Sequence, residues 1–277
     1  MPRQYCIWIV TPEGYTHTRC FEEVALSLKE AFAALGMEAP IVTDALAVKG
    51  TAIALGPHML SYMVYPRDLI LYNFEQIYQN PVVMTPTYIE LLKKFPVWDY
   101  SRLNIGALAA HGIPAALCGV GYTPGLTRIA PAPDKDIDVL FIGSLNPRRG
   151  FVLEQLRAQG AKVHVAFDCY GPERDALIAR AKILLNLHFY PAKLFEIVRV
   201  SYLLANSACV VSETGLDMEL EAPFAGGVAF CGYDGLAQAC LKLLGDDAAR
   251  ARIAKRGFEQ MRTLSQQDML QRALAAT

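Results

Sequence analysis

Short apolar runs recur along the chain, and each is followed by a stretch in which apolar residues repeat every three or four positions. Most of the runs are continuous rather than alternating, which is typical of strands buried on both faces of a parallel sheet. The runs that predict strands are Tyr5–Val10, Ala52–Leu55, Leu69–Tyr72, Asp138–Ile142, Val163–Phe167, Ile183–Leu187, Cys209–Ser212 and Val228–Cys231.

The stretches between these runs predict helices. Apolar residues from Phe21 to Leu35 fall on one helical stripe, and Gly36 is placed to end that helix. Thr87 and Glu90 have the spacing of a capping box. Alternation of strand and helix predicts an α/β fold with parallel sheets.

A proline-containing stretch, LTRIAPAPDKDID at 126–138, interrupts this alternation. Its two prolines disfavour helix and favour an extended connector. We therefore expect two domains, residues 1–130 and 131–277, with a final helix near Gln266–Ala275. The alternative is a long surface loop within a single sheet.

Composition narrows the class of protein. Of 277 residues 53% are hydrophobic and 19% are charged, which excludes a disordered chain. The formal net charge is −1, so no global basic field favours nucleic acid or an anionic membrane as the main partner. The seven cysteines include no C-x-x-C pair, and no run is long enough for a signal peptide or a membrane span. These observations predict a cytoplasmic protein without a transmembrane segment, a disulfide framework or a structural zinc site.

The sequence GSLNPRRG, which follows the strand predicted at Asp138–Ile142, suggests an anion site. Asn146 suits a helix N-cap and Pro147 the first helical position, which puts Arg148 and Arg149 in the first turn. Cations there oppose the helix dipole, and a bound phosphate would remove that conflict. The alternative is a pair of solvated surface arginines. The dinucleotide-binding and P-loop fingerprints are absent.

Four polar residues follow the strand at Ile183–Leu187. They are His188, Lys193, Glu196 and Arg199. The carboxyl end of a strand is where open α/β sheets bind ligands. The alternatives are a surface ion pair for Glu196 with Arg199 and a core position for His188. Glu213 ends the next strand and is a further candidate for ligand binding. The alternative is that it is an ordinary carboxylate in a turn.

The run AKILLNLHFYPAKLFEIVRVSYLLANSACVVS at 181–212 resembles the nucleotide-sugar-binding domain of GT-B glycosyltransferases. The likeness is nearest to bacterial family-1-like and spore-coat-type members, and it covers about residues 137–275. It implies two Rossmann-like domains with parallel sheets facing an interdomain cleft. Two positions depart from the family pattern. Tyr202 stands where the ribose-binding glutamate is usual, and Asn206 replaces the usual glycine.

The resemblance implies transfer of a sugar from a nucleotide-sugar donor to an acceptor saccharide, lipid-linked glycan or protein. No DxD motif lies near the donor residues, so we expect no cofactor and no essential metal, the nucleotide-sugar being a substrate. A nucleotide-sugar epimerase and a non-catalytic nucleotide-sugar-binding protein are the alternatives. The residues expected to bind the donor are Gly143, Ser144, Asn146, Arg148, Arg149, His188, Lys193, Glu196, Arg199 and Glu213.

In that family the N-terminal domain supplies the acceptor side. His17 follows the first predicted strand, and a histidine accepts a proton at neutral pH, so His17 is the expected base. Glu23 and Glu75 are the other candidates for the catalytic base. The alternative for each is a solvated carboxylate without a catalytic role. Asn73 and Tyr122 are expected on the acceptor side.

Overall fold

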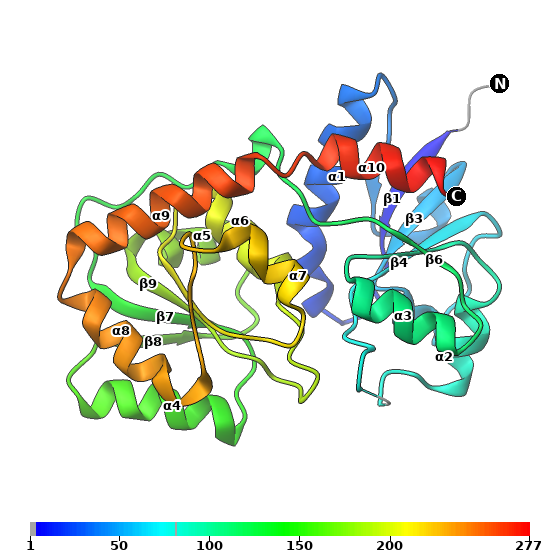
Figure 1. Cartoon of the computed structure of the whole chain (residues 1–277). Helices are drawn as coiled ribbons and strands as arrows, with labels where there is room; N and C mark the ends of the chain where they lie inside the picture. The colour runs from blue at the N-terminus through cyan, green and yellow to red at the C-terminus, as the bar shows by residue number, and fades with distance from the viewer. Residues whose placement is uncertain (1–3, 81) are drawn as a thin grey trace. The chain divides into compact units, whose positions relative to one another are not determined.

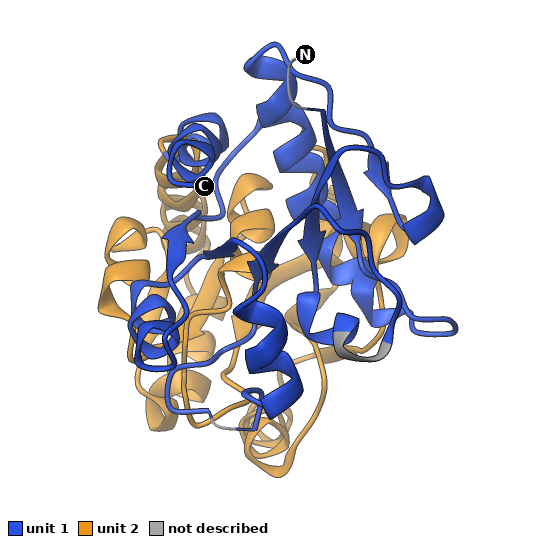
Figure 2. Ribbon diagram, turned by 90° about the vertical axis from the view of Figure 1, so that its right-hand side faces the viewer, with its two compact units in different colours: residues 1–126, 264–277 blue, residues 127–263 orange. Residues whose placement is uncertain are grey.

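The computed structural model describes residues 4–80 and 82–277 (Figure 1). The chain divides into two compact units (Figure 2). Unit 1 comprises Met1–Leu126 and Leu264–Thr277, and unit 2 comprises Thr127–Thr263. Each unit is an α/β domain built on one parallel sheet.

The described part of unit 1 has a sheet in the order β2-β1-β3-β4-β5-β6, with every neighbouring pair parallel. Side chains of β1, β3 and β4 are buried along their whole length, as the continuous apolar runs predicted. The strands are β1 (Tyr5–Ile9), β2 (Ile41–Val42), β3 (Thr51–Leu55), β4 (Leu69–Asn73), β5 (Val97–Asp99) and β6 (Ala115–Leu117).

Helices pack on this sheet. The α-helices are α1 (Glu22–Ala34), α2 (Pro86–Leu92), α3 (Arg102–Ala110) and α10 (Gln266–Ala275), and the 3-10 helices are η1 (His17–Phe21), η2 (Ala45–Ala47), η3 (Pro57–Tyr62) and η4 (Pro124–Leu126). The predicted stripe on α1 is confirmed, and Gly36 follows the helix with φ +74°. The capping prediction for Thr87 was wrong. Because α2 begins at Pro86, the preceding Thr85 is the cap, and its hydroxyl accepts from the N–H of Tyr88.

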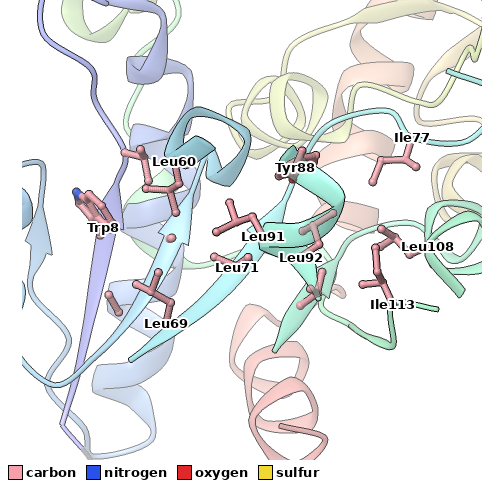
Figure 3. Close-up of a cluster of buried hydrophobic side chains, with 14 of the residues drawn as sticks. Trp8, Leu60, Leu69, Leu71, Ile77, Tyr88, Leu91, Leu92, Leu108 and Ile113 are labelled. Carbon is pink, nitrogen blue, oxygen red and sulfur yellow. The ribbon is translucent and has the colours of Figure 1, made fainter. Parts of the chain in front are cut away.

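A buried apolar cluster joins the sheet of unit 1 to η3 and α2 (Figure 3). Trp8 and Leu71 come from the sheet, Leu60 from η3, and Tyr88 and Leu91 from α2. Burial of each large side chain contributes about 1.5–3 kcal/mol. The cluster therefore fixes the segments that follow the carboxyl ends of β3 and β4.

The described part of unit 2 has a parallel sheet in the order β11-β10-β9-β7-β8. Its strands are β7 (Ile137–Ile142), β8 (Val163–Ala166), β9 (Ala181–Asn186), β10 (Val210–Glu213) and β11 (Ala229–Cys231). Its helices are α4 (Pro147–Ala158), α5 (Gly171–Arg180), α6 (Ile197–Ala205), α7 (Met218–Glu221), η5 (Ala222–Phe224), η6 (Tyr233–Gly235), α8 (Leu236–Leu244) and α9 (Asp247–Arg262). The strand order reverses between β7 and β9, which is the place where doubly wound sheets bind ligands.

The compact units differ from the expected domains at two places: the first boundary follows Leu126 rather than residue 130, and the last segment belongs to unit 1. Helix α10 matches the predicted final helix, yet it packs on α1 and β6 of unit 1. Gln266 explains this placement, because its buried side-chain amide accepts from the N–H of Gly121 and donates to the carbonyl of Gly119.

Asn206, which replaces the family's usual glycine, does not take the left-handed conformation that glycine readily adopts. Its φ is −112°, and Ser207 adopts φ +54° instead. The Asn206 side chain accepts from the N–H groups of Arg128 and Ile129, which ties the connector to α6. Tyr202, at the family's glutamate position, contacts the guanidinium groups of Arg128 and Arg174 through its ring. No helix among residues 4–80 and 82–277 is both long and apolar enough to cross a membrane.

Candidate functional site

The residues expected to bind the donor gather beyond the carboxyl ends of β7, β9 and β10 in unit 2. The N-terminus of α4 forms one side of this group. Asn146 caps the helix as predicted, with its side-chain oxygen accepting from the N–H of Arg149 at 2.8 Å. Pro147 occupies the first turn, so Arg148 and Arg149 start the helix at the reversal of strand order.

Arg148 is the more exposed of the two arginines. Its side chain is 30% exposed and forms a two-pronged ion pair with Glu213, of which the Nη1–Oε2 bond is 2.7 Å. The guanidinium lies 3.9 Å from the centre of the Tyr233 ring, and the Tyr233 hydroxyl donates to the Arg148 carbonyl. These contacts orient Arg148 while leaving part of its surface accessible to an anion.

Arg149 is 3% exposed, which excludes the solvated-surface interpretation for this residue. Its guanidinium donates to the carbonyls of Ser144, at 2.8 Å, and Leu187. Burial and the neighbouring Arg199 lower the pKa of Arg149 to about 10, so it stays protonated at neutral pH. Arg149 therefore joins the loops after β7 and β9 and adds a fixed positive charge beneath them.

Glu196 and His188 form a buried charged pair. Nδ1 of His188 lies 3.1 Å from Oε2 of Glu196, and Asn186 donates to the same oxygen at 2.9 Å. Burial alone would lower the pKa of His188 and raise that of Glu196, but each charge favours the other. The net result is a raised pKa for His188 and a lowered pKa for Glu196.

Arg199 approaches the backbone at Gly143. A Cβ at Gly143, where φ is +146°, would lie 3.4 Å from one Arg199 nitrogen and 3.6 Å from one Arg149 nitrogen. Nη1 of Arg199 donates to the side chain of Asn186 at 2.9 Å. Sequence analysis missed Asn186, although a single asparagine in the apolar strand ILLNL was the available signal.

Glu213 is 1% exposed and forms ion pairs with two cations, Arg148 and Lys193. Nζ of Lys193 lies 3.3 Å from Oε1 of Glu213. Burial would raise the pKa of Glu213, but the hydrogen bond from Arg148 and the nearby His188 hold it below its ordinary value. Glu213 therefore acts as a buried anchor for Arg148 and Lys193 rather than as an ordinary turn carboxylate.

The arrangement suits an anion with several oxygens. Three cationic side chains are partly exposed at one sheet edge, namely Arg148, Lys193 and Arg199. The carboxylates of Glu196 and Glu213 are both matched by cations. Such charge-assisted donors at the positive end of a helix dipole favour phosphate groups.

The expected acceptor-side residues of unit 1 lie in different environments. His17 begins η1, and its ring packs edge-on against Tyr15 with a centroid distance of 5.3 Å. Glu23 is buried on α1. Tyr122 pairs its backbone with Leu264 and Gln266. Glu75 lies 3.2 Å from His58, a histidine that sequence analysis did not select.

Asn73, which is expected on the acceptor side, lies inside unit 1. It is fully buried, and its side chain uses both of its N–H donors and both acceptor positions. The partners are the backbone of Glu75, the carboxylate of Asp99 and the hydroxyl of Tyr88. Asn73 is therefore part of the buried framework beneath the sheet edge.

Known proteins resemble this chain in sequence and in fold. No protein-family model matches the sequence. An uncharacterized protein of Acanthamoeba polyphaga mimivirus, L140, is 28% identical over 192 residues, which are 64% of this chain and 62% of L140. The chain thus spans less than two thirds of the length of L140, and it spans 13% and 17% of two other mimivirus proteins. These relatives are viral, so they do not support the expected bacterial subgroup.

Solved structures match almost the whole chain at low identity. HepE of Anabaena in complex with UDP-glucose has a TM-score of 0.66 at 12% identity, covering 99% of this chain and 100% of HepE. A mutant of the T4 phage protein BGT with UDP-glucose has a TM-score of 0.60 at 10% identity, covering 98% and 97% of the two chains. AviGT4, a glycosyltransferase of avilamycin A biosynthesis, has a TM-score of 0.56 at 14% identity, covering 100% and 99%. The fold is therefore the GT-B type, with two Rossmann-like α/β domains, and this expectation is confirmed.

Proposed function

We propose that the chain is a glycosyltransferase that uses a nucleotide-sugar donor bound by unit 2. The observation that carries the proposal is a set of three partly exposed cations, Arg148, Lys193 and Arg199. They lie where the order of strands in the sheet of unit 2 reverses. They are suited to stabilise a leaving diphosphate, whose negative charge grows as the sugar departs. The structures of similar fold that contain UDP or UDP-glucose support this proposal. The acceptor would be a saccharide, a lipid-linked glycan or a protein.

We further propose that transfer needs no divalent metal. The two carboxylates among the expected donor residues are already neutralised, Glu196 by His188 and Arg149, and Glu213 by Arg148 and Lys193. A divalent cation would have to displace these partners, whereas the cations can contact the diphosphate directly. Transfer should persist in EDTA. Loss of activity in the chelator, with recovery on adding Mg²⁺ or Mn²⁺, would contradict metal independence.

The proposed function is tested by calorimetry of the full chain with UDP, GDP, TDP and CMP. We expect one nucleotide to bind and Arg148→Ala to weaken it about 10- to 100-fold, because a hydrogen bond to a charged group contributes about 1.5–3 kcal/mol. Arg157→Ala is the matched control, since Arg157 lies on the same helix but pairs with exposed Glu154. If no nucleotide binds, the proposal fails.

Turnover separates transfer from the alternatives. A glycosyltransferase consumes its nucleotide-sugar faster when an acceptor is present. An epimerase converts the sugar without an acceptor, and a binding protein leaves the nucleotide-sugar intact.

A further inference from the structure

Strand β8 (Val163–Ala166) is an edge of the sheet of unit 2 (Figure 1). In the common doubly wound sheet a further strand lies outside this position. The described part of unit 2 has no such strand, because β8 leads through α5 directly to β9, which pairs with β7 on the side away from β8. One side of β8 is therefore open in the described chain.

The backbone of β8 alternates between its two sides. The carbonyls of Lys162 and Ala166 accept from the N–H groups of β7 and of the residue after it, at 3.2 and 2.9 Å. Because successive residues of a strand point their backbone groups in opposite directions, Val163 and Val165 direct theirs to the open side. Nothing in the part of the chain that the structure describes forms a hydrogen bond with these groups. A row of such N–H and C=O groups is a template for another strand.

The side chains of this segment complement a second copy of it. Val163 and Val165 pack against the core of unit 2, and Phe167, the next residue in that alternation, is 55% exposed. Lys162 and Asp168 flank the strand and are exposed. A two-fold axis at Val165 would place Val163 beside Phe167 of the second copy. The same axis would place Lys162 beside Asp168 of that copy, and each pair would occur twice.

We propose that two copies of this chain associate by antiparallel pairing of their β8 edges, with the two-fold axis at Val165. In this register the outward backbone groups of the two strands face one another, as a hydrogen-bonded antiparallel pair requires. An axis at His164 or at Ala166 would also match the backbone. It would place Lys162 beside Ala166 or Tyr170, so the lysine–aspartate pair would be lost. The partner is a second copy, because an unrelated strand would not repeat both pairs.

Charge reversal tests the pairing. Sedimentation velocity of the full chain should show a dimer at concentrations up to about 1 mM, where even weak pairs associate. Lys162→Glu and Asp168→Lys should each weaken dimerisation about 10-fold or more, because each brings like charges together twice. An equimolar mixture of the two variants should restore association, since both contacts of the mixed pair join opposite charges. Lys242→Glu is the matched control, because Lys242 is exposed on α8.

Val165→Pro tests the backbone of the pair. Proline removes the N–H that lies at the axis, and an edge strand tolerates proline where that N–H faces solvent. We expect this variant to stay monomeric, and circular dichroism and its unfolding midpoint check that it folds. If it unfolds, the mixture of charge variants still decides the proposal.

A parent chain that remains monomeric up to about 1 mM overturns the proposal. So does a dimer that survives both charge reversals unchanged, because another surface would then hold it. Failure of the mixed variants to associate rejects the axis at Val165. Nucleotide binding measured on the same samples keeps these outcomes apart from the proposed function, which does not require a dimer.

Discussion

At the scale of single residues, Arg149 is a candidate donor residue that also has a structural role. Its guanidinium is enclosed by two carbonyls, the carboxylate of Glu196 and the rings of Phe141 and Phe189. The local pattern Asn-Pro-Arg-Arg predicted the helix start correctly. It could not distinguish the buried arginine from the accessible one, because that depends on strands distant in sequence.

Arg149→Ala should therefore lower the free energy of unfolding by about 1.5–3 kcal/mol or more, since it removes charged hydrogen bonds and leaves buried carbonyls without a donor. Arg157→Ala is expected to stay within about 0.5 kcal/mol, as is usual for exposed positions. Urea denaturation of both variants measures the difference. Equal stabilities would show that the carbonyls find other partners.

The buried pair of His188 and Glu196 predicts a pH dependence of stability. Burial would lower the pKa of His188, but Glu196 raises it above its ordinary value near 6.5. A histidine whose folded pKa is raised stabilises the fold fully below its unfolded pKa. That contribution is lost as the pH rises through the folded pKa.

The free energy of unfolding of the parent minus that of His188→Gln should therefore be largest near pH 6 and shrink as the pH rises toward 9. Each pKa unit of the shift corresponds to about 1.4 kcal/mol. Denaturant titrations between these pH values measure it. His164→Gln is the control for the substitution itself, because His164 is exposed on β8. A difference that grows with pH would mean that His188 is neutral in the folded protein.

At the scale of elements, the loops after β9 and β10 are in close contact at Gly215. A Cβ there would lie 2.2 Å from the carbonyl oxygen of Lys193 and 3.2 Å from Nε2 of His188. Because contacts this short do not occur, Gly215→Ala must displace the loop that carries Lys193.

We expect Gly215→Ala to lower the melting temperature and to weaken binding of the nucleoside diphosphate together. Gly232→Ala should change neither, since it has an ordinary extended backbone and nothing within 4 Å of a new Cβ. Thermal unfolding and calorimetry on the two variants test the prediction. Normal binding by a destabilised Gly215→Ala protein would separate the loop from the donor site.

The elements that sequence reasoning missed share a physical cause. Strands β5 and β6 have three residues each, and β6 is rich in alanine, so neither gives a clear apolar run. Local signals such as the cap at Asn146 were read correctly because the cap bonds to a residue three positions away. The pair of His58 and Glu75 depends on the register of β3 and β4, which no local pattern encodes.

At the scale of the whole molecule, unit 1 contains segments from both ends of the described chain. Helix α10 belongs with α1 and β6, and Gln266 connects these parts through Ser27, Gly119 and Gly121. The expected second domain, residues 131–277, was one continuous stretch of the chain. The order of helices and strands along the chain does not reveal which helix covers which sheet.

Gln266→Ala should lower the stability of the protein by about 1–3 kcal/mol, because it leaves buried backbone groups unpaired. Nucleotide affinity should change less than twofold, since every proposed donor residue lies in unit 2. Gln271→Ala, on the exposed side of the same helix, is the control and should have no effect on stability. Calorimetry and denaturation together check both values, and a large loss of nucleotide affinity would contradict the assignment of the donor to unit 2.

The return of the chain to unit 1 also sets an order of assembly during synthesis. Domains generally fold as units while the ribosome extends the chain. Residues 127–263 form one uninterrupted unit, so unit 2 can close as soon as its last helix emerges. Unit 1 begins earlier but must wait for α10, and the surfaces of α1 and β6 that α10 covers stay open to solvent or to a chaperone until then. Unit 1, whose synthesis starts first, is therefore the unit that completes its fold last.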